Sequence, residues 1–202
     1  MPVAELFVGV RKAVTLLLWA LFIGTQALVF FMVSWLSTLL VQLGSPMDQA
    51  LLALSLFHLG SFIVGLLAAW QSDQRSPELM LALIYLVAAG SLVLLAVGGV
   101  QGMALFPLCF LAGGGIVGAS FCLGALAASY YPPPIRAMGF GWGLAVGRIG
   151  SITSPILGGL AIAAHWPVQS IFLTAVLPAL ICAVVVLILR TLRPRLIGMI
   201  AR

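Results

Sequence analysis

The sequence predicts an all-α, polytopic membrane protein with six transmembrane helices. The chain has 202 residues, of which 63% are hydrophobic and only 6% are charged, whereas about a quarter of the residues of a soluble domain are charged. Its apolar residues form long runs, each with roughly the ~20 residues that a helix needs to cross a bilayer. We place the six spans at residues 13–36 (or on to 43), 49–70, 79–98, 103–128, 137–163 and 170–189.

The first two spans are separated by a turn that also begins a helix. A short, mixed lead-in at residues 1–12 ends in two basic residues, and the first apolar run starts directly after them. Ser45 suits the N-cap of the second helix and Pro46 its first position, because the proline lacks an N–H that a helix start would leave unpaired. The second span then ends at the polar loop 71–75.

The third and fourth spans lie within one uncharged stretch. Residues 79–135 carry no charge, and they are too many for a single span. The glycine-rich segment 98–102 is the natural break between two helices. The proline run 132–134 closes the fourth span, because proline cannot continue a helix.

The fifth span follows these prolines, and basic residues follow the sixth span. A short loop at residues 165–167 separates the two spans, and residues 190–202 carry four arginines. The expected organisation is therefore a cytoplasmic lead-in at 1–12, a six-helix transmembrane domain at 13–189 and a basic cytoplasmic tail at 190–202.

The distribution of basic residues predicts the orientation in the membrane. Six spans place both ends of the chain on the same side, and eight of the nine basic residues fall on that side: Arg11, Lys12, Arg75, Arg136, Arg190, Arg193, Arg195 and Arg202. The loops on the other side contain no Lys or Arg. Because short cytoplasmic loops of membrane proteins carry an excess of Lys and Arg, both termini are expected in the cytoplasm of a cell whose inner or plasma membrane holds the protein.

The sequence argues against nucleic-acid binding and against enzyme chemistry. The net charge is +5, but the basic residues are scattered singly at the ends of apolar runs and form no basic surface. There is no GxSxG, no HExxH, no pair of intramembrane aspartates and no P-loop. We therefore expect no catalytic residues, no metal site, no cofactor and no nucleic-acid partner, with the lipid bilayer as the surroundings.

Arg148 is the charged residue expected deepest within a span. It follows Arg136 by twelve residues, which places it ~18 Å further along a helix and about halfway through a hydrocarbon core of ~30 Å. As a structural group it would pair with a carboxylate or with helix carbonyls. As a functional group it would bind an anion, most simply a carboxylate held by its bidentate fork. The spans offer no Asp or Glu, which favours the anion, while a partner on another chain stays open.

Other polar and aromatic residues have both a structural and a functional interpretation. Gln26 and His58 lie near the middle of the first two spans; they either bond a neighbouring helix or line a pathway, where a histidine is suited to carry protons. Trp142 either packs at an interface or stacks on an aromatic substrate. Asp73 and Arg75, in the loop, are either solvated charges or a latch between helix pairs.

Small residues recur along the fifth span and predict close packing against another helix. They form two rows at intervals of about four residues, the first with Gly139, Gly143, Gly147 and Ser151 and the second with Gly150, Ser154 and Gly158. The functional extension of this pattern is a helix that slides or rocks during a transport cycle, with Pro155 permitting a bend.

The stretch from Tyr131 to Gly159 resembles a known family almost residue for residue. The matching residues are Tyr131-Pro132, Ile135-Arg136-Ala137, Gly139, Gly141-Trp142, Gly147-Arg148-Ile149-Gly150 and Pro155 to Gly159. They resemble the loop and eleventh helix of major facilitator superfamily transporters, most like the aromatic acid:proton symporters (4-hydroxybenzoate and benzoate types). Leu16–Trp19 and Ser34–Leu36 are similar to the family's seventh helix, and Gly60, Gly65, Asp73 and Pro77 keep the spacing of its loop between helices eight and nine.

The resemblance implies the carboxy-terminal, six-helix half of a twelve-helix transporter for small aromatic carboxylates and protons. It gives functional weight to Asp73, Arg136 and Arg148. We expect Arg148 to hold the substrate carboxylate and His58, Gln26 and Trp142 to line the cavity. Asp73 and Arg136, with Arg75 in the same loop, are expected to serve the cytoplasmic gate. This chain departs from the family at three positions, where Ser37 replaces a proline, Gln74 a basic residue and Glu78 a histidine.

Three functional interpretations remain open at this point. The chain is a half-length transporter, or a truncated or split half without transport activity of its own, or a six-span interaction or sensor protein. In the second case it assembles with a separate amino-terminal half or with itself. The acidic residues that the resemblance places in the family's first helix would precede Met1.

Overall fold

The computed structural model describes residues 3–72, 76–97 and 102–200. This part of the chain contains six long helices, two short 3-10 helices and no strand, and each long helix is long and apolar enough to span a membrane, as predicted. The elements are η1 (Val3–Phe7), α1 (Arg11–Gln42), α2 (Met47–Ser72), α3 (Pro77–Val97), η2 (Gly102–Ala104), α4 (Leu105–Ser129), α5 (Pro133–Ala163) and α6 (Val168–Ile200).

The helices extend beyond several of the predicted boundaries. α5 begins at Pro133 and not at residue 137, with Pro132 as an extended N-cap. The reason is that proline is disfavoured inside a helix but suits its first turn, where the N–H groups have no intrahelical partner. The proline run therefore starts the fifth helix as well as ending the fourth. α1 continues to Gln42, close to the longer of the two predicted ends.

Both terminal segments that we expected outside the bundle are partly helical. α6 runs through Pro194 to Ile200, so most of the predicted tail continues the sixth helix. In the predicted lead-in, η1 folds back on α1, and the side chain of Leu6 is completely buried. The Thr15 hydroxyl donates to the Leu6 carbonyl at 2.9 Å and accepts a hydrogen bond from Tyr131 at 3.1 Å, which ties η1 to α1 and to the start of α5.

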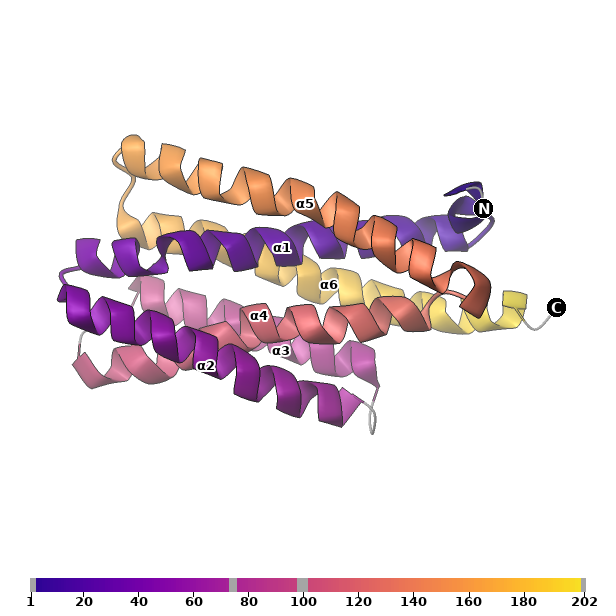
Figure 1. Cartoon of the computed structure of the whole chain (residues 1–202), viewed down its shortest axis with the longest axis horizontal. Helices are drawn as coiled ribbons and strands as arrows, with labels where there is room; N and C mark the ends of the chain where they lie inside the picture. The colour runs from indigo at the N-terminus through magenta and orange to yellow at the C-terminus, as the bar shows by residue number, and fades with distance from the viewer. Residues whose placement is uncertain (1–2, 73–75, 98–101, 201–202) are drawn as a thin grey trace.

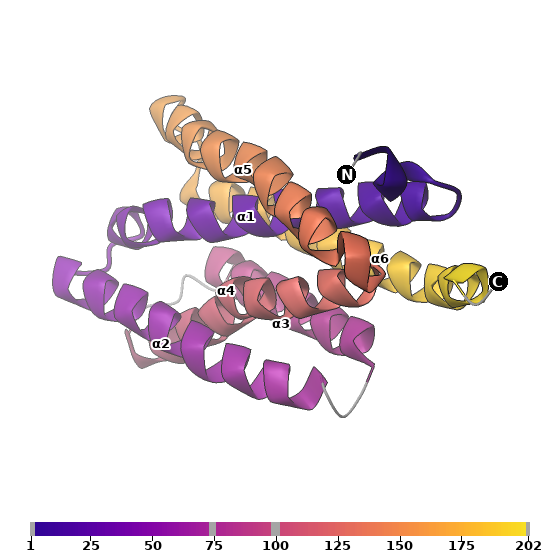
Figure 2. The ribbon, with the colours of Figure 1, turned by 45° about the vertical axis from the view of Figure 1, so that its right-hand side comes forward.

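The six helices form one bundle (Figure 1). The start of α1 and the end of α6 lie at the same end of it, which we call the end with the termini. α1 packs against α5 and α6, α2 packs against α4, and α3 packs against α4 and α6. α5 and α2 lie at opposite edges of the bundle in both views (Figures 1 and 2). Two clusters of buried apolar side chains fill the bundle, one towards the end with the termini and the other towards the opposite end.

A hydrogen-bonded pair joins α1 to α3 inside the bundle. Thr25 and Tyr85 are both fully buried, and their hydroxyl oxygens are 2.5 Å apart. Because the Thr25 hydroxyl donates to the Leu21 carbonyl at 2.6 Å, the Tyr85 hydroxyl is the donor to Thr25. The pair therefore satisfies polar groups that would be costly to bury alone.

A buried ion pair joins three helices at the end with the termini. Glu78, in the first turn of α3, is only 1% exposed, and its Oε1 accepts hydrogen bonds from Arg193 of α6 at 2.5 Å and from Tyr130 at the end of α4 at 3.0 Å. Burial raises the pKa of the Tyr130 hydroxyl, and the adjacent Glu78 carboxylate raises it further. The tyrosine therefore remains protonated and continues to donate its hydrogen bond.

Candidate functional site

The predicted site centres on α5, whose glycines bring its backbone against α1. An added Cβ at Gly150 would meet the carbonyl oxygen of Ile23, and one at Gly143 would meet the ring of Phe22. These contacts leave no room for a side chain at either position. The remaining glycines of the predicted rows are buried too, Gly139 against Tyr131, Gly147 against Phe22 and Gln26, and Gly158 against Trp35 and Phe31.

Arg148 projects from α5 beside this glycine contact. The helix is continuous from Arg136 to Arg148, so the separation of ~18 Å along the axis holds, and Arg148 lies near the middle of the 31 residues of α5. The residue is exposed. Within the described residues, its side chain has no ion pair or hydrogen bond, and the buried Glu78 is already bound to Arg193. The guanidinium is therefore available to an anion from outside this chain.

Two of the residues predicted to line the cavity lie on α1 and α5, but only one of them lies near Arg148. Gln26 is half-buried, and its Cγ is 3.2 Å from the position of a Cβ on Gly147, the neighbour of Arg148. Trp142 is 41% exposed and stacks on Trp19, with ring centroids 6.2 Å apart. Since a helix turns by ~100° per residue, Trp142 points about 120° away from Arg148 around α5.

His58 lies on α2, at the opposite edge of the bundle from α5 (Figure 2). Its imidazole is exposed and packs edge-on against Phe57, with ring centroids 5.6 Å apart. The described chain therefore does not bring His58 together with Arg148 and Gln26.

Arg136, one of the three residues predicted to form the gate, lies in the first turn of α5, at the end with the termini. It is exposed, and its Nε donates to the Tyr131 carbonyl at 3.4 Å. Asp73 and Arg75 lie outside the described residues, so their role at the gate stays a prediction.

Sequence reasoning missed two interactions near these residues. The indole N–H of Trp35 donates to the Pro155 carbonyl at 3.0 Å, which links α1 to α5 about two turns beyond Arg148, further from the end with the termini. It also missed the ion pair of Glu78 with Arg193, because Glu78 falls one residue before the predicted third span and the arginines of the tail were expected outside the bundle. The sequence pattern did not predict that α6 continues as a helix past residue 189. This continuation brings Arg193 to Glu78.

The fold and the unpaired arginine define a multi-pass, all-α protein of the cell membrane that exposes a cation near the middle of one of its spans. Comparison with curated proteins identifies relatives of this kind. The chain is 32% identical over 185 residues to the 4-hydroxybenzoate transporter PcaK of Pseudomonas aeruginosa, which covers 92% of this chain and 41% of that protein. It is 30% identical over 192 residues to the benzoate transport protein of Acinetobacter baylyi, covering 95% and 41%.

A third relative is the 3-(3-hydroxy-phenyl)propionate transporter of Escherichia coli, at 32% identity over 196 residues, or 96% of this chain and 48% of that protein. No protein-family model matches the chain. The chain is thus a homologue of bacterial aromatic-acid transporters along nearly its whole length. It spans less than half of the length of these three relatives, as the resemblance to one transporter half implied.

Proposed function

We propose that this chain forms one half of a proton-coupled transporter of small aromatic carboxylates, and that Arg148 binds the carboxylate. The observation that carries the proposal is the exposed guanidinium near the middle of α5, a predicted membrane span, without a partner in the described chain. A charge at this depth is costly, so it is retained where a cavity or an ionic ligand compensates it. The names of the relatives supply the ligand class, since each of the three transports an aromatic acid.

The neighbours of Arg148 fit a binding surface on α1 and α5. Gln26 offers an amide beside Gly147, and Trp35 is fixed against α5 by its bond to Pro155. His58 and Trp142 retain their predicted cavity roles only if elements outside this chain complete the cavity, because the bundle points them away from Arg148. No residue receives a catalytic role.

The other wall of the cavity belongs to a second unit in this proposal. Transporters of the major facilitator superfamily place their site between two six-helix halves, and this chain has the extent of one of them. A separate amino-terminal half or a second copy of the chain would supply the wall facing Arg148. The basic residues gathered at the end with the termini support a cytoplasmic location for that end, with Asp73, Arg75 and Arg136 at the gate.

The test uses proteoliposomes that contain the chain alone or together with the six-helix amino-terminal half of a relative. Uptake of labelled 4-hydroxybenzoate is measured with and without an inward proton gradient. We expect uptake only with both halves, a loss of at least tenfold for Arg148→Ala, and partial recovery for Arg148→Lys, which keeps the charge without the fork.

Arg190→Ala is the matched control, because Arg190 is also exposed but lies near the end of the membrane span of α6. Unchanged uptake by Arg148→Ala in an active assembly would exclude the proposed role. Gradient-driven uptake by the chain alone would show that no separate amino-terminal half is needed. The absence of uptake in every assembly would favour the inert or interaction-protein alternative.

A further inference from the structure

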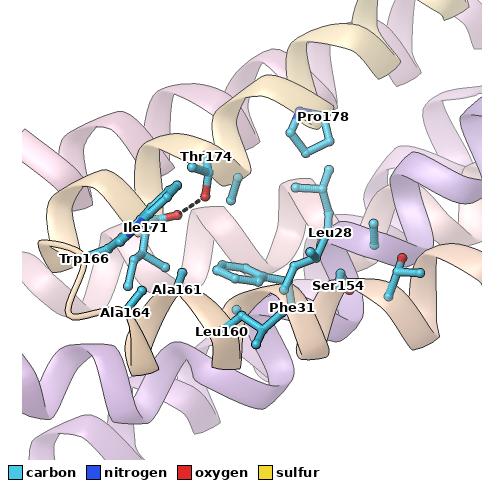
Figure 3. Close-up of a pocket in the computed structure, with 15 residues that line it drawn as sticks. Leu28, Phe31, Ser154, Leu160, Ala161, Ala164, Trp166, Ile171, Thr174 and Pro178 are labelled. Carbon is cyan, nitrogen blue, oxygen red and sulfur yellow. Dashed lines mark hydrogen bonds between the residues drawn. The ribbon is translucent and has the colours of Figure 1, made fainter.

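A groove runs between α1, α5 and α6 at the end of the bundle away from the termini. Its volume is about 550 Å³, and α5 and α6 form its two sides while α1 forms its floor. Figure 3 shows Leu28 and Phe31 on the floor, with Leu160 and Ala161 on one side and Thr174 and Pro178 among the residues of the other. The turn between α5 and α6 closes the groove at Trp166, which is half exposed.

The groove is separate from the proposed substrate site. Ser154, which lines it, follows Arg148 by six residues. At ~100° per residue, the two side chains therefore point about 120° apart around α5. Trp35 bonds the Pro155 carbonyl, and it is not among the residues that line the groove. A ligand in the groove would therefore not contact Arg148.

The groove offers nothing that would hold a carboxylate. No Asp, Glu, Lys or Arg occurs from Ile149 to Leu189, the stretch that supplies both of its sides. The hydroxyls of Thr153 and Thr174 each donate to a carbonyl of their own helix, at 2.8 and 2.7 Å. The Ser154 oxygen has no hydrogen-bond partner within the described residues, but it is buried, so a ligand at the surface of the groove does not reach it. An ionised aromatic acid would lose its hydration here without a compensating charge, so the groove suits a neutral, apolar occupant.

The length of the groove fits a single hydrocarbon chain. The lining residues of α5 run from Thr153 to Ala164, which corresponds to ~17 Å along a helix and to about half of a hydrocarbon core of ~30 Å. The groove is thus about one leaflet long, the length over which one acyl chain extends.

We propose that this groove binds one acyl chain of a bilayer phospholipid from the leaflet opposite the termini. Trp166 lies at its outer end, at the level where tryptophans sit beside lipid headgroups. The acyl chain follows α5 inward towards Leu28 and Thr153. It fills the space between α5 and α6, which are joined by a short turn and contact each other little along their length.

The test counts the phospholipid molecules that remain bound when the chain is extracted from vesicles of 1-palmitoyl-2-oleoyl-phosphatidylcholine into mild detergent. Native mass spectrometry of the wild type should show one retained lipid per chain. Ala161→Phe and Ala164→Phe place a ring in the groove and should lower the retained fraction at least fivefold. Ala145→Phe is the matched control, because Ala145 is an exposed alanine of the same helix outside the groove, and it should retain the lipid.

Circular dichroism and size-exclusion chromatography verify that each variant is folded. Ala164 is exposed, so we expect Ala164→Phe to fold. This variant still tests the proposal if Ala161→Phe does not fold. Equal retention in the wild type and the filled variants, or equal loss in Ala145→Phe, would overturn the proposal. The proposal would also be overturned if the chain forms a dimer that both groove-filling substitutions dissociate, because a second copy would then occupy the groove. The measurement needs no transport, so it can fail or succeed independently of the proposed function.

Discussion

The two sides of the bundle differ in whether a buried charge holds them together. Glycine contacts occur on both sides, since an added Cβ at Gly115 of α4 would meet the backbone of Ala88 in α3. α3, α4 and α6 are also joined by the buried Glu78, which is bonded to Arg193 and Tyr130. α5 is joined to α1 by glycine contacts and by the hydrogen bond from Trp35 to the Pro155 carbonyl, and neither involves a charged group. In an apolar stretch of 18 residues within each helix, 56% of the residues of α3 and of α4 are buried inside the bundle, but only 22% of the residues of α5.

The difference shows which part of the bundle is built to stay together and which part is built to face another surface. Buried hydrogen bonds to a charge fix one geometry, because leaving the charge unpaired is costly. The contacts of α5 with α1 include glycines and one hydrogen bond between uncharged groups, which contributes less than a bond to a charge. We therefore expect α5 to separate from the bundle more readily than α3, α4 or α6, and the following substitutions test this.

The largest effect is expected for Gly150→Leu. The new side chain would have to displace the Ile23 carbonyl, which is backbone and cannot turn aside, and overpacking of this kind costs about 3 kcal/mol. Unfolding in sodium dodecyl sulfate, followed by circular dichroism in mixed micelles, measures the change. Gly141→Leu is the control on the same helix, because nothing lies within 4 Å of the added Cβ. Equal destabilisation by both would refute the backbone contact.

Arg193→Leu is expected to have the next largest effect, on the other side of the bundle. It leaves Glu78 buried without its cation; since the Arg193 side chain is 36% exposed, water reaches the site and the cost is about 2 kcal/mol. Adding Glu78→Gln should recover part of this loss, because no unpaired charge remains. The same unfolding assay measures both, with Arg190→Leu as the control. A double variant that is less stable than Arg193→Leu would contradict the pairing.

Tyr85→Phe is expected to have a smaller effect. It removes the hydrogen bond to Thr25, but the Thr25 hydroxyl still donates to the Leu21 carbonyl, so the cost is about 1 kcal/mol. A double-mutant cycle with Thr25→Val isolates the energy of the bond. Strictly additive effects of the two substitutions would mean that the two hydroxyls do not interact.

The smallest effect concerns pH and Tyr130. Its pKa is raised in the folded state, mainly by burial and then by Glu78, whereas an unfolded tyrosine ionises near pH ~10. The folded state thus retains a proton that the unfolded state loses, and this contribution to stability declines as the pH rises above ~10. Thermal unfolding between pH 8 and 11 should show a steeper alkaline decline for the wild type than for Tyr130→Phe. Parallel curves would exclude the contribution.

Much of the fold could be predicted from the sequence because lipid imposes simple rules on it. Span lengths, the break near residue 100 and the helix start near Ser45 and Pro46 follow from hydropathy and from the chemistry of proline and glycine. The start of α5 and the end of α6 were misplaced for local reasons, since Pro133 and Pro134 were treated only as helix breakers and Pro194 is accommodated within α6. Hydropathy marks the part of a helix in lipid and not its extension into water.

The candidate site was less predictable, because it depends on how helices rotate about their axes. Helical spacing predicts which residues share a face, and the glycine rows of α5 do line the face that contacts α1. Spacing along separate helices does not reveal that His58 and Arg148 lie at opposite edges. The partner of Glu78 could not be predicted from its own span either, because Arg193 lies 115 residues later.

The continuous α6 also has a practical consequence for imaging. Its 33 residues correspond to ~50 Å of helix, about 20 Å more than a hydrocarbon core of ~30 Å. The bond from Arg193 to Glu78 fastens α6 to the bundle, and residues 194–200 continue the helix past this bond. We expect them to form a short stalk in water at the end with the termini. A soluble helical protein joined in register to this stalk would rotate with the membrane domain, and would give electron microscopy a fiducial for a particle that is otherwise almost entirely hidden in lipid.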